Sequence, residues 1–286
     1  MKSLNRSAVV VLLATSAAFA QISNIVVTSA ASFEAGMPAK GSIAAIFCTG
    51  LQVEGVVVAE TLPLPFKLAG VKVWVGGAPA PLFAVAAGQG FQQVNIQVPQ
   101  EAEFKTDNTT EVVIEQGGQR GTGAATLRAS TPGDFFRWPG TNLGIFQHWP
   151  DYSLVTEENP ARPGEILITY LTGMPETSPV VPTGEPSPSD PLATVRQYFS
   201  AAFVDQLSLQ FRRVESGVAQ SSGVTWAGLT PGLVGVYQAN FKLPDTVESG
   251  GQIVNLMRHT CNGIFGSCGG GTHSYYFSSA VFLPVR

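Results

Sequence analysis

Short runs of apolar and β-branched residues alternate along the chain with glycine and proline punctuation, a pattern typical of strands and turns. In the first half these runs lie at Ile25–Val27, Ile43–Phe47, Val71–Val75, Val94–Val98 and Val112–Ile114. In the second half they lie at Ile166–Leu171, Leu207–Phe211, Val234–Leu243, Ile253–Met257 and Tyr275–Leu283. Convincing amphipathic helices do not alternate with these runs. The pattern therefore favours antiparallel sheets packed face to face over a parallel α/β sheet.

One phrase occurs twice, as Gln93–Pro99 and as Gln238–Pro244, and both copies alternate polar and apolar residues before a final proline. An upstream segment is also repeated, because Gly41–Leu51 matches Gly164–Met174 in its glycine, its apolar run and its Thr-Gly pair. These echoes indicate an internal duplication of a strand-rich unit, with the repeated phrases on equivalent strands. Alternation turns one set of side chains in each phrase towards a core: Val94, Ile96 and Val98 in one copy, and Ala239, Phe241 and Leu243 in the other.

The expected organisation has four parts: a signal peptide at 1–20, a first β-sandwich at 21–130, an aromatic-rich connection and hairpin at 131–158, and a second β-sandwich at 159–286. Pro150-Asp151 is typical of a hairpin turn within the connection. The proline-rich segment Pro175–Pro191 is expected to be a surface excursion with little regular hydrogen bonding, because proline removes backbone donors and fixes φ.

Composition and charge narrow the location and the partners. The chain has 286 residues, of which 44% are hydrophobic and 13% charged, and its formal net charge is −4. Lys2 and Arg6 precede an apolar run and the small-residue cleavage site Ala18-Phe19-Ala20, as in a secretory signal. An acidic chain without a basic cluster disfavours nucleic acid, and no later stretch has the length of a membrane span. We expect a secreted protein, extracellular or periplasmic, with no membrane insertion.

Several motifs follow one another in a fixed order: Ala30–Phe33, Leu68–Val71 with Ala80–Phe83, Asn159–Gly164 and Pro231–Asn240. In this order they resemble the Solibacter-type uncharacterised C-terminal domain of secreted acidobacterial proteins, and the duplicated units resemble IPT/TIG domains. The resemblance implies an all-β chain of two tandem immunoglobulin-like β-sandwich units, and it implies no known activity. The chain departs from the family pattern at Cys48, where glycine is usual, and at His259–His273, which looks like an insertion in a short hairpin.

The insertion carries two cysteines and two histidines, and it can be read in three ways. Cys261 and Cys268 can close a disulfide, which an oxidising compartment favours. The same cysteines with His259 and His273 have the ligand types of a tetrahedral zinc site, although the spacing is not that of a standard finger. They can also remain free thiols. We expect the disulfide, no metal and no cofactor, with Cys48 buried and unpaired in an apolar strand.

Candidate ligand-binding residues are the aromatic side chains Trp138, Trp149 and Tyr152 of the connection and the imidazoles His259 and His273 of the insertion. Aromatic rings with polar edges suit pyranose rings, whereas the alternative role for the aromatic side chains is packing between the units.

No catalytic residue is assigned, because the chain lacks the familiar nucleophile, metalloprotease and phosphate-loop motifs. The paired acids, such as Glu157 with Glu158, are typical of solvated connections. The sequence favours an exported binding, adhesion or envelope-associated structural module whose partner is an extracellular glycan or a cell-surface protein. The alternative is a secreted glycan-acting hydrolase with a non-standard site, which would gather its acids in one pocket.

Overall fold

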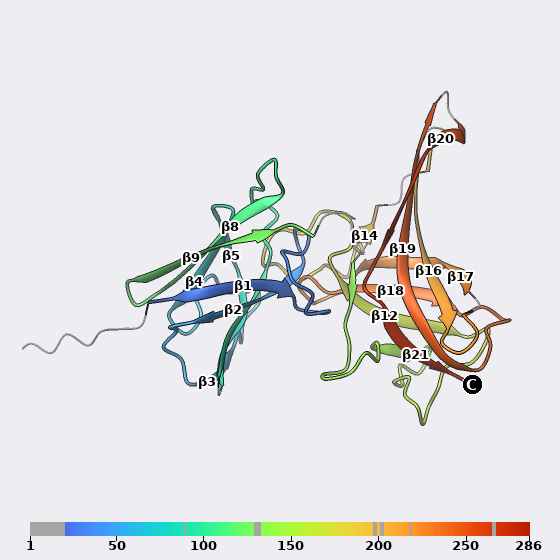
Figure 1. The fold of residues 1–286 in the computed structure, drawn as a ribbon, viewed down its shortest axis with the longest axis horizontal. Helices are drawn as coiled ribbons and strands as arrows, with labels where there is room; N and C mark the ends of the chain where they lie inside the picture. Colours follow the sequence, from blue (N-terminus) through green and yellow to red (C-terminus); the bar gives the residue numbers. More distant parts are fainter. Residues whose placement is uncertain are drawn as a thin grey trace, which may run out of the picture.

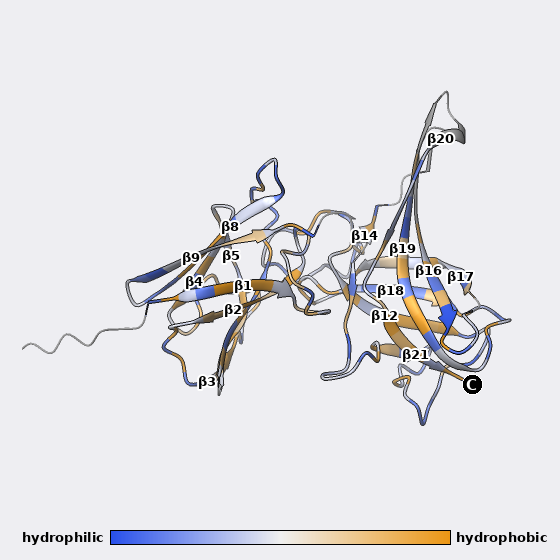
Figure 2. Cartoon of the chain, in the orientation of Figure 1, coloured by the Kyte–Doolittle hydropathy of each residue, from blue (hydrophilic) through white to orange (hydrophobic). Residues whose placement is uncertain are grey.

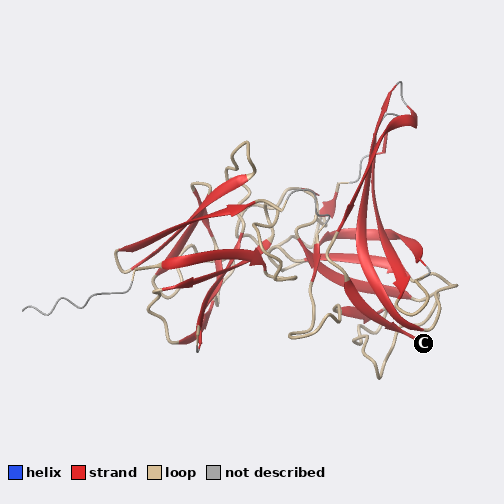
Figure 3. Cartoon of the chain, viewed as in Figure 1, coloured by secondary structure: helices blue, strands red, loops and turns tan. Residues whose placement is uncertain are grey.

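In the described part of the chain all the regular secondary structure is β-strand, and loops connect the strands (Figure 3). The computed structural model describes residues 21–88, 90–128, 133–196, 199–200, 203–217, 219–264 and 267–286. The expected signal peptide, residues 1–20, lies outside these ranges. Within them, no helix is found that is long and apolar enough to cross a membrane. The expected all-β fold class is confirmed.

The first unit is a sandwich of two antiparallel sheets with orders β1-β2-β7-β6-β3 and β5-β4-β8-β9 (Figure 1). The strands are β1 (Ser23–Ser29), β2 (Ile43–Thr49), β3 (Gly55–Val58), β4 (Val71–Val75), β5 (Ala78–Ala80), β6 (Leu82–Gly88), β7 (Phe91–Gln97), β8 (Thr109–Gln116) and β9 (Gln119–Thr126). Aliphatic side chains from both sheets fill the space between them, and Ile46, Val73, Ile96 and Ile114 are fully buried there.

The second unit is a continuous antiparallel sheet that folds over on itself. Its main path is β10-β12-β18-β17-β16-β19-β20, with β11 also on β12, β14 on β17 and β21 on β19. The strands are β10 (Asp134–Phe135), β11 (Phe146–His148), β12 (Ile166–Thr172), β13 (Thr177–Ser178), β14 (Thr194–Val195), β15 (Phe199–Ser200), β16 (Phe203–Arg213), β17 (Ala219–Leu229), β18 (Tyr237–Lys242), β19 (Gly250–Ile264), β20 (Ser267–Phe277) and β21 (Val281–Val285).

A cluster of phenylalanine rings forms the centre of the second core. Phe146 lies 6.0 Å from Phe135 and 6.2 Å from Phe241, and Phe211 lies 5.7 Å from Phe241, measured between ring centroids. All four side chains are buried. The hydropathy colouring marks β12 and β21 as largely apolar (Figure 2). The second core therefore relies on aromatic packing where the first relies on aliphatic residues.

The duplication is visible in the register of the paired strands. β2 pairs with β7 in the first unit, and β12 pairs with β18 in the second. Ala45 faces Asn95 and Ile168 faces Asn240, so the repeated phrases occupy equivalent strands in an identical register. The residues expected to face the cores are all fully buried: Val94, Ile96, Val98, Ala239, Phe241 and Leu243.

The strand that crosses between the layers is repeated as well. In the first unit β5 pairs with β4 and β6 pairs with β7; in the second, the two ends of β17 pair with β16 and β18. The register slips between Leu82 and Ala84 in β6, and between Val224 and Trp226 in β17. The bulge in β6 lies opposite Asn95 and Ile96, and the bulge in β17 lies opposite the equivalent residues Asn240 and Phe241. The extra residue in a bulge bends its strand. The chain is thus two tandem immunoglobulin-like sandwiches of one topology.

Buried polar contacts join the two units. Thr172 at the end of β12 accepts a hydrogen bond from the backbone N–H of Ile43 at 2.8 Å and donates one to the carbonyl of Gly235 at 2.8 Å. Gly235 has φ +65°, and a Cβ there would lie 2.8 Å from the carbonyl oxygen of Gly41. Backbone of the first unit therefore approaches Gly235 closely enough to exclude a side chain at that position.

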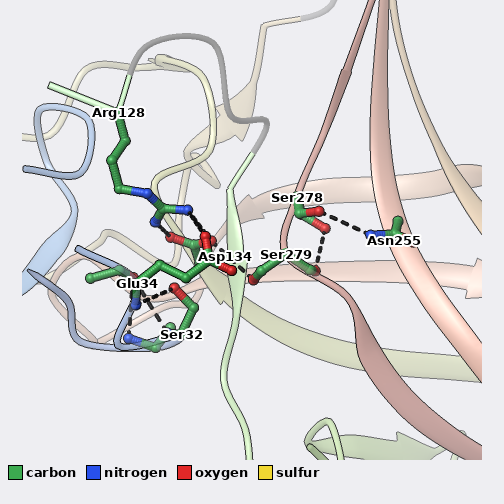
Figure 4. A network of polar contacts seen from close by, with 9 residues as sticks. Ser32, Glu34, Arg128, Asp134, Asn255, Ser278 and Ser279 are labelled. Atoms are coloured by element: carbon green, nitrogen blue, oxygen red, sulfur yellow. Dashed lines mark hydrogen bonds and ion pairs between the residues drawn. The ribbon is translucent and has the colours of Figure 1, made fainter. Parts of the chain in front are cut away.

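An ion pair crosses the same junction (Figure 4). Arg128 follows β9 of the first unit, and its guanidinium contacts the carboxylate of Asp134 on β10 of the second unit. The same guanidinium contacts Glu34 of the first unit at 2.5 Å, and the Ser279 hydroxyl donates to Asp134 at 3.1 Å. The Asp134 side chain is only 2% exposed, so the arginine takes the place of water as the partner of this carboxylate.

The proline-rich segment has little regular structure, as predicted, with a two-residue strand at Thr177–Ser178, but it docks on the first unit instead of standing free in solvent. Gly184 donates its N–H to the side-chain oxygen of Gln97 at 2.6 Å and accepts from the N–H of Leu64 at 2.9 Å. The Thr183 hydroxyl donates to Glu101 at 2.7 Å. Sequence composition favours solvation for such a segment, but the backbone groups that proline leaves free find partners on the neighbouring unit.

The aromatic connection likewise has a structural role within the second sheet. Its strands β10 and β11 both pair with β12, and its Phe135 and Phe146 belong to the core. Packing therefore accounts for these two rings. The turn at Pro150-Asp151 does form a hairpin, since His148 donates its N–H to the Ser153 carbonyl at 2.9 Å.

Candidate functional site

The five expected ligand-binding residues lie at three separate places on the second unit. Trp149 and Tyr152 lie together on the hairpin that follows β11. His259 and His273 face each other across β19 and β20. Trp138 lies on the hairpin that follows β10. The structure therefore does not join these residues into a single site.

Trp149 and Tyr152 form a surface that we call the aromatic corner. Their ring centroids are 5.4 Å apart and their planes meet at 79°, a T-shaped contact. Trp149 is 48% exposed and Tyr152 is 51% exposed. Two large aromatic side chains half exposed next to each other are typical of an interaction site.

The turn beneath the aromatic corner is fixed by its own hydrogen bonds. Tyr152 has φ +58°, an uncommon conformation for a side chain of this size, and it donates its N–H to the His148 carbonyl at 2.9 Å. Gln147 donates its side-chain amide to the Tyr152 carbonyl at 2.8 Å. Asp151 accepts from the backbone and the hydroxyl of Ser153, which lowers the pKa of that carboxyl.

His148 supports the same hairpin from below. Its Nδ1 lies 3.1 Å from Glu165 and its Nε2 lies 3.2 Å from the Asn159 carbonyl. Glu165 also accepts the backbone N–H of Arg162 at 2.8 Å. Both ring nitrogens of His148 are thus engaged by the protein, which suits a structural histidine better than a general base.

The second place is the long hairpin of β19 and β20, which projects from the body of the second unit (Figure 1). His259 Nε2 lies 3.0 Å from His273 Nδ1, and the two imidazole planes differ by 10°. Tyr275 is the cross-strand partner of His259 and stacks on it at 4.6 Å between centroids. The imidazoles therefore interact with each other and with a phenol ring. Among the described residues no group of three or more His, Cys, Asp or Glu is placed to hold a metal.

The structure describes two of the three cysteine side chains, those of Cys48 and Cys261. Cys48 is buried and free, as expected, and desolvation raises the pKa of its thiol to about 11. Cys261 is buried on β19 opposite His273. The side chain of Cys268 lies outside the described part, so its pairing with Cys261 stays a prediction.

Trp138 lies at the wall of two clefts. One is lined with Thr156, Glu157, Glu158 and Phe282, and the other with residues that include Phe33 and Arg137. Sequence reasoning missed Phe33 and Arg137. Phe33 ends a motif that the resemblance uses, but no local pattern marks its ring as exposed or places Arg137 opposite it. These two residues come together only through the junction of the units.

Comparisons with known proteins bear on the fold. No protein-family model matches the chain, and no significant match is found among curated proteins. Tandem immunoglobulin domains of titin match among solved structures: one pair is 14% identical, covering 87% of this chain and 93% of that chain with a TM-score of 0.18. A second pair is 9% identical with coverages of 87% and 90% and a TM-score of 0.16. A third titin structure is 10% identical with coverages of 92% and 100% and a TM-score of 0.18.

TM-scores this low carry no argument about function or ancestry. The class of protein rests instead on the strand order and pairing of this chain, which define a tandem immunoglobulin-like sandwich protein.

Proposed function

We propose that the chain is an exported, non-catalytic binding module that uses the aromatic corner to stack on the sugar rings of an extracellular glycan. The observation that carries this proposal is the half exposure of both Trp149 and Tyr152 on a turn whose backbone is fixed by hydrogen bonds. A pyranose presents an apolar face of C–H groups and a polar rim of hydroxyls. Covering the exposed half of one aromatic side chain contributes about 2 kcal/mol.

Rigidity matters for such a site because the aromatic rings lose little freedom when a ligand binds. A preorganised turn lowers the entropic cost of association. The exposed polar residues Asp151 and Asn159 flank the aromatic corner and supply groups for hydroxyls. A binding module requires a shallow aromatic surface of this kind. A glycosidase instead requires two carboxylates that flank the substrate in a concave pocket.

The same proposal includes export of the chain and a disulfide in the hairpin of β19 and β20. The secretory pattern at residues 1–20 and the ordered motifs of the Solibacter-type family support an exported member of that family. An oxidising compartment supports a disulfide between Cys261 and Cys268, which would close the projecting hairpin.

The test is glycan binding by matched variants of the mature chain. Trp149→Ala and Tyr152→Ala are each expected to weaken binding to the glycans selected by the wild-type chain on a glycan array, by about tenfold or more. Phe91→Ala is the control, because Phe91 is 49% exposed but lies on β7 of the first unit. Equal binding by all variants and the wild type would contradict the proposal.

The hydrolase alternative has one observation in its favour, since Glu157 and Glu158 line a cleft with Trp138. Incubation of a bound glycan with the wild-type chain tests it through the appearance of new reducing ends. Release that is lost in a Glu157→Gln, Glu158→Gln double variant would favour the hydrolase over the binding module.

A further inference from the structure

A cleft of about 560 Å³ lies where the two units meet, and it is separate from the aromatic corner. The first unit contributes residues 30–33 and the second contributes the hairpin 136–142. Three features of this cleft point to a ligand, and each comes from a different residue.

Phe33 is strained and exposed at the edge of the cleft. Its φ is +57°, in the left-handed region that larger residues rarely adopt, and its side chain is 58% exposed. The backbone around it is held by Ser29, whose carbonyl accepts the N–H of Phe33 at 3.0 Å. A strained residue that also leaves its aromatic ring in solvent contributes little to folding, and such outliers cluster at functional sites.

Arg137 provides positive charge in the cleft. Its side chain is partly buried, and within the described part of the chain its guanidinium forms no ion pair. Its Nη1 donates a hydrogen bond to the side-chain oxygen of Asn142 at 3.3 Å. A guanidinium carries five donors, so most of this one remains available for a carboxylate. Glu34 follows Phe33 and Asp134 precedes Arg137 in sequence, but both carboxylates are held by Arg128.

Trp138 supplies a second aromatic wall on a fixed hairpin. The backbone N–H of Trp138 donates to the Leu143 carbonyl at 2.9 Å. The backbone carbonyl of Trp138 accepts from both the N–H and the hydroxyl of Thr141. The indole nitrogen of Trp138 and Nε of Arg137 are buried polar atoms without a partner among the described residues. Proteins rarely leave such donors unsatisfied, which indicates side chains that change partners when the cleft is filled.

We propose that this cleft binds a saccharide that carries a carboxylate, with a hexuronic acid ring between Phe33 and Trp138 and its carboxylate on Arg137. The two rings match the apolar face of a pyranose, and a guanidinium matches a carboxylate in a bidentate contact. The side chains of Ser32, Thr141 and Asn142 in the cleft suit the remaining hydroxyls. A phosphate group carries more charge and is typically held by several cations, whereas the described lining of the cleft contains a single cation, Arg137.

The probe is a linear hexuronic acid oligomer, and its methyl ester is the matched ligand without charge. The acid is expected to bind the wild-type chain at least tenfold more tightly than the ester in calorimetry, with an affinity that falls as salt is added. Arg137→Gln is expected to lose that preference and to bind acid and ester alike. Arg212→Gln is the control, because Arg212 is exposed on β16 of the same unit.

Phe33→Gly gives an independent arm, because glycine adopts a positive φ without strain. This variant is expected to melt at a higher temperature than the wild type while binding the acid oligomer about tenfold more weakly. A gain in stability excludes misfolding as the reason for lost binding. Trp149→Ala is expected to keep full binding of the acid oligomer, so failure of the aromatic corner and failure of this cleft are distinguishable.

Three outcomes would overturn the assignment of the cleft. The ester binds as tightly as the acid; Arg137→Gln keeps the preference for the acid; or benzoate competes as well as the oligomer, which would assign the cleft to simple aromatic acids instead of saccharides.

Discussion

Asn95 and Asn240 make the same hydrogen bond in the two units. Each accepts the side-chain amide of the glutamine two residues earlier, Gln93 at 2.7 Å and Gln238 at 2.8 Å. Each also sits opposite the bulged strand of its own unit. Side-chain geometry as well as backbone pairing is therefore shared by the two copies, which lets residues of one unit serve as matched controls for the other.

Thr172 provides the first such comparison, since its counterpart in the first unit is Thr49. Replacing Thr172 with valine removes the buried partner of the Ile43 N–H and of the Gly235 carbonyl. The expected cost is about 2–4 kcal/mol in the free energy of unfolding, measured with denaturant. Thr49→Val is expected to cost roughly 0.5 kcal/mol or less, because Thr49 is exposed. Similar values for the two variants would contradict a structural role for Thr172 at the junction.

Arg128 provides the second prediction. Its removal leaves the buried Asp134 carboxylate without its cation, so Arg128→Ala is expected to cost about 3–5 kcal/mol of stability. Arg120→Ala is the control, since Arg120 is 60% exposed in its pair with Glu115, and is expected to cost about 1 kcal/mol or less. Denaturant unfolding measures both. An Arg128→Ala chain as stable as the control would show that the pair does not hold the units together.

Cys48 gives a prediction about pH. Burial raises the pKa of its thiol from 9.0 to about 11, so the folded chain keeps its proton where the unfolded chain loses it. The thiol therefore contributes fully to the free energy of unfolding below pH 9. Its contribution falls by roughly 2 kcal/mol as the pH rises towards 11. The measurement is denaturant unfolding of the wild type and Cys48→Ala between pH 8 and about 11. The alanine variant should lose less stability over this range; parallel pH profiles would show that the thiol contributes nothing.

The proposed disulfide is tested by counting reactive thiols. In unfolded, unreduced mature protein, an alkylating reagent is expected to modify only Cys48, and after reduction it should modify Cys261 and Cys268 as well. Mass spectrometry gives the count directly. Closing this short loop is expected to contribute about 2 kcal/mol. Three modifications before reduction would show free thiols, and stoichiometric zinc in the purified chain would replace the disulfide with a metal site.

The repeated phrases made the fold predictable because alternation and duplication are both local signals. A strand that turns every second side chain inward has a fixed face, so Val94 and Phe241 could be placed in the cores before their partners were known. Half exposure of Trp149 and Tyr152 was not predictable in the same way. The adjacent aromatic residues Phe135 and Phe146 have a similar local pattern and are buried.

Contacts between the units lay beyond local signals altogether. Arg128 and Asp134 are close in sequence, but their pairing depends on how the second sheet is placed against the first. Proline composition predicted a solvated segment at Pro175–Pro191, yet Gly184 docks on Gln97 through a backbone group that composition does not describe. The cleft between Phe33 and Arg137 has the same origin, because its two walls are about a hundred residues apart and neither carries a motif for its ligand.

The bulges in β6 and β17 indicate which features of the chain are older than the duplication and which are younger. A feature found at the same point in both copies is most simply inherited from a single ancestral sandwich, which already had a strand bent between two layers. The ion pair of Arg128 and the docking of Gly184 require two copies, so they arose only after the gene had doubled. The cleft between the units has the same requirement, because one of its walls belongs to each copy and a single sandwich could not have formed it.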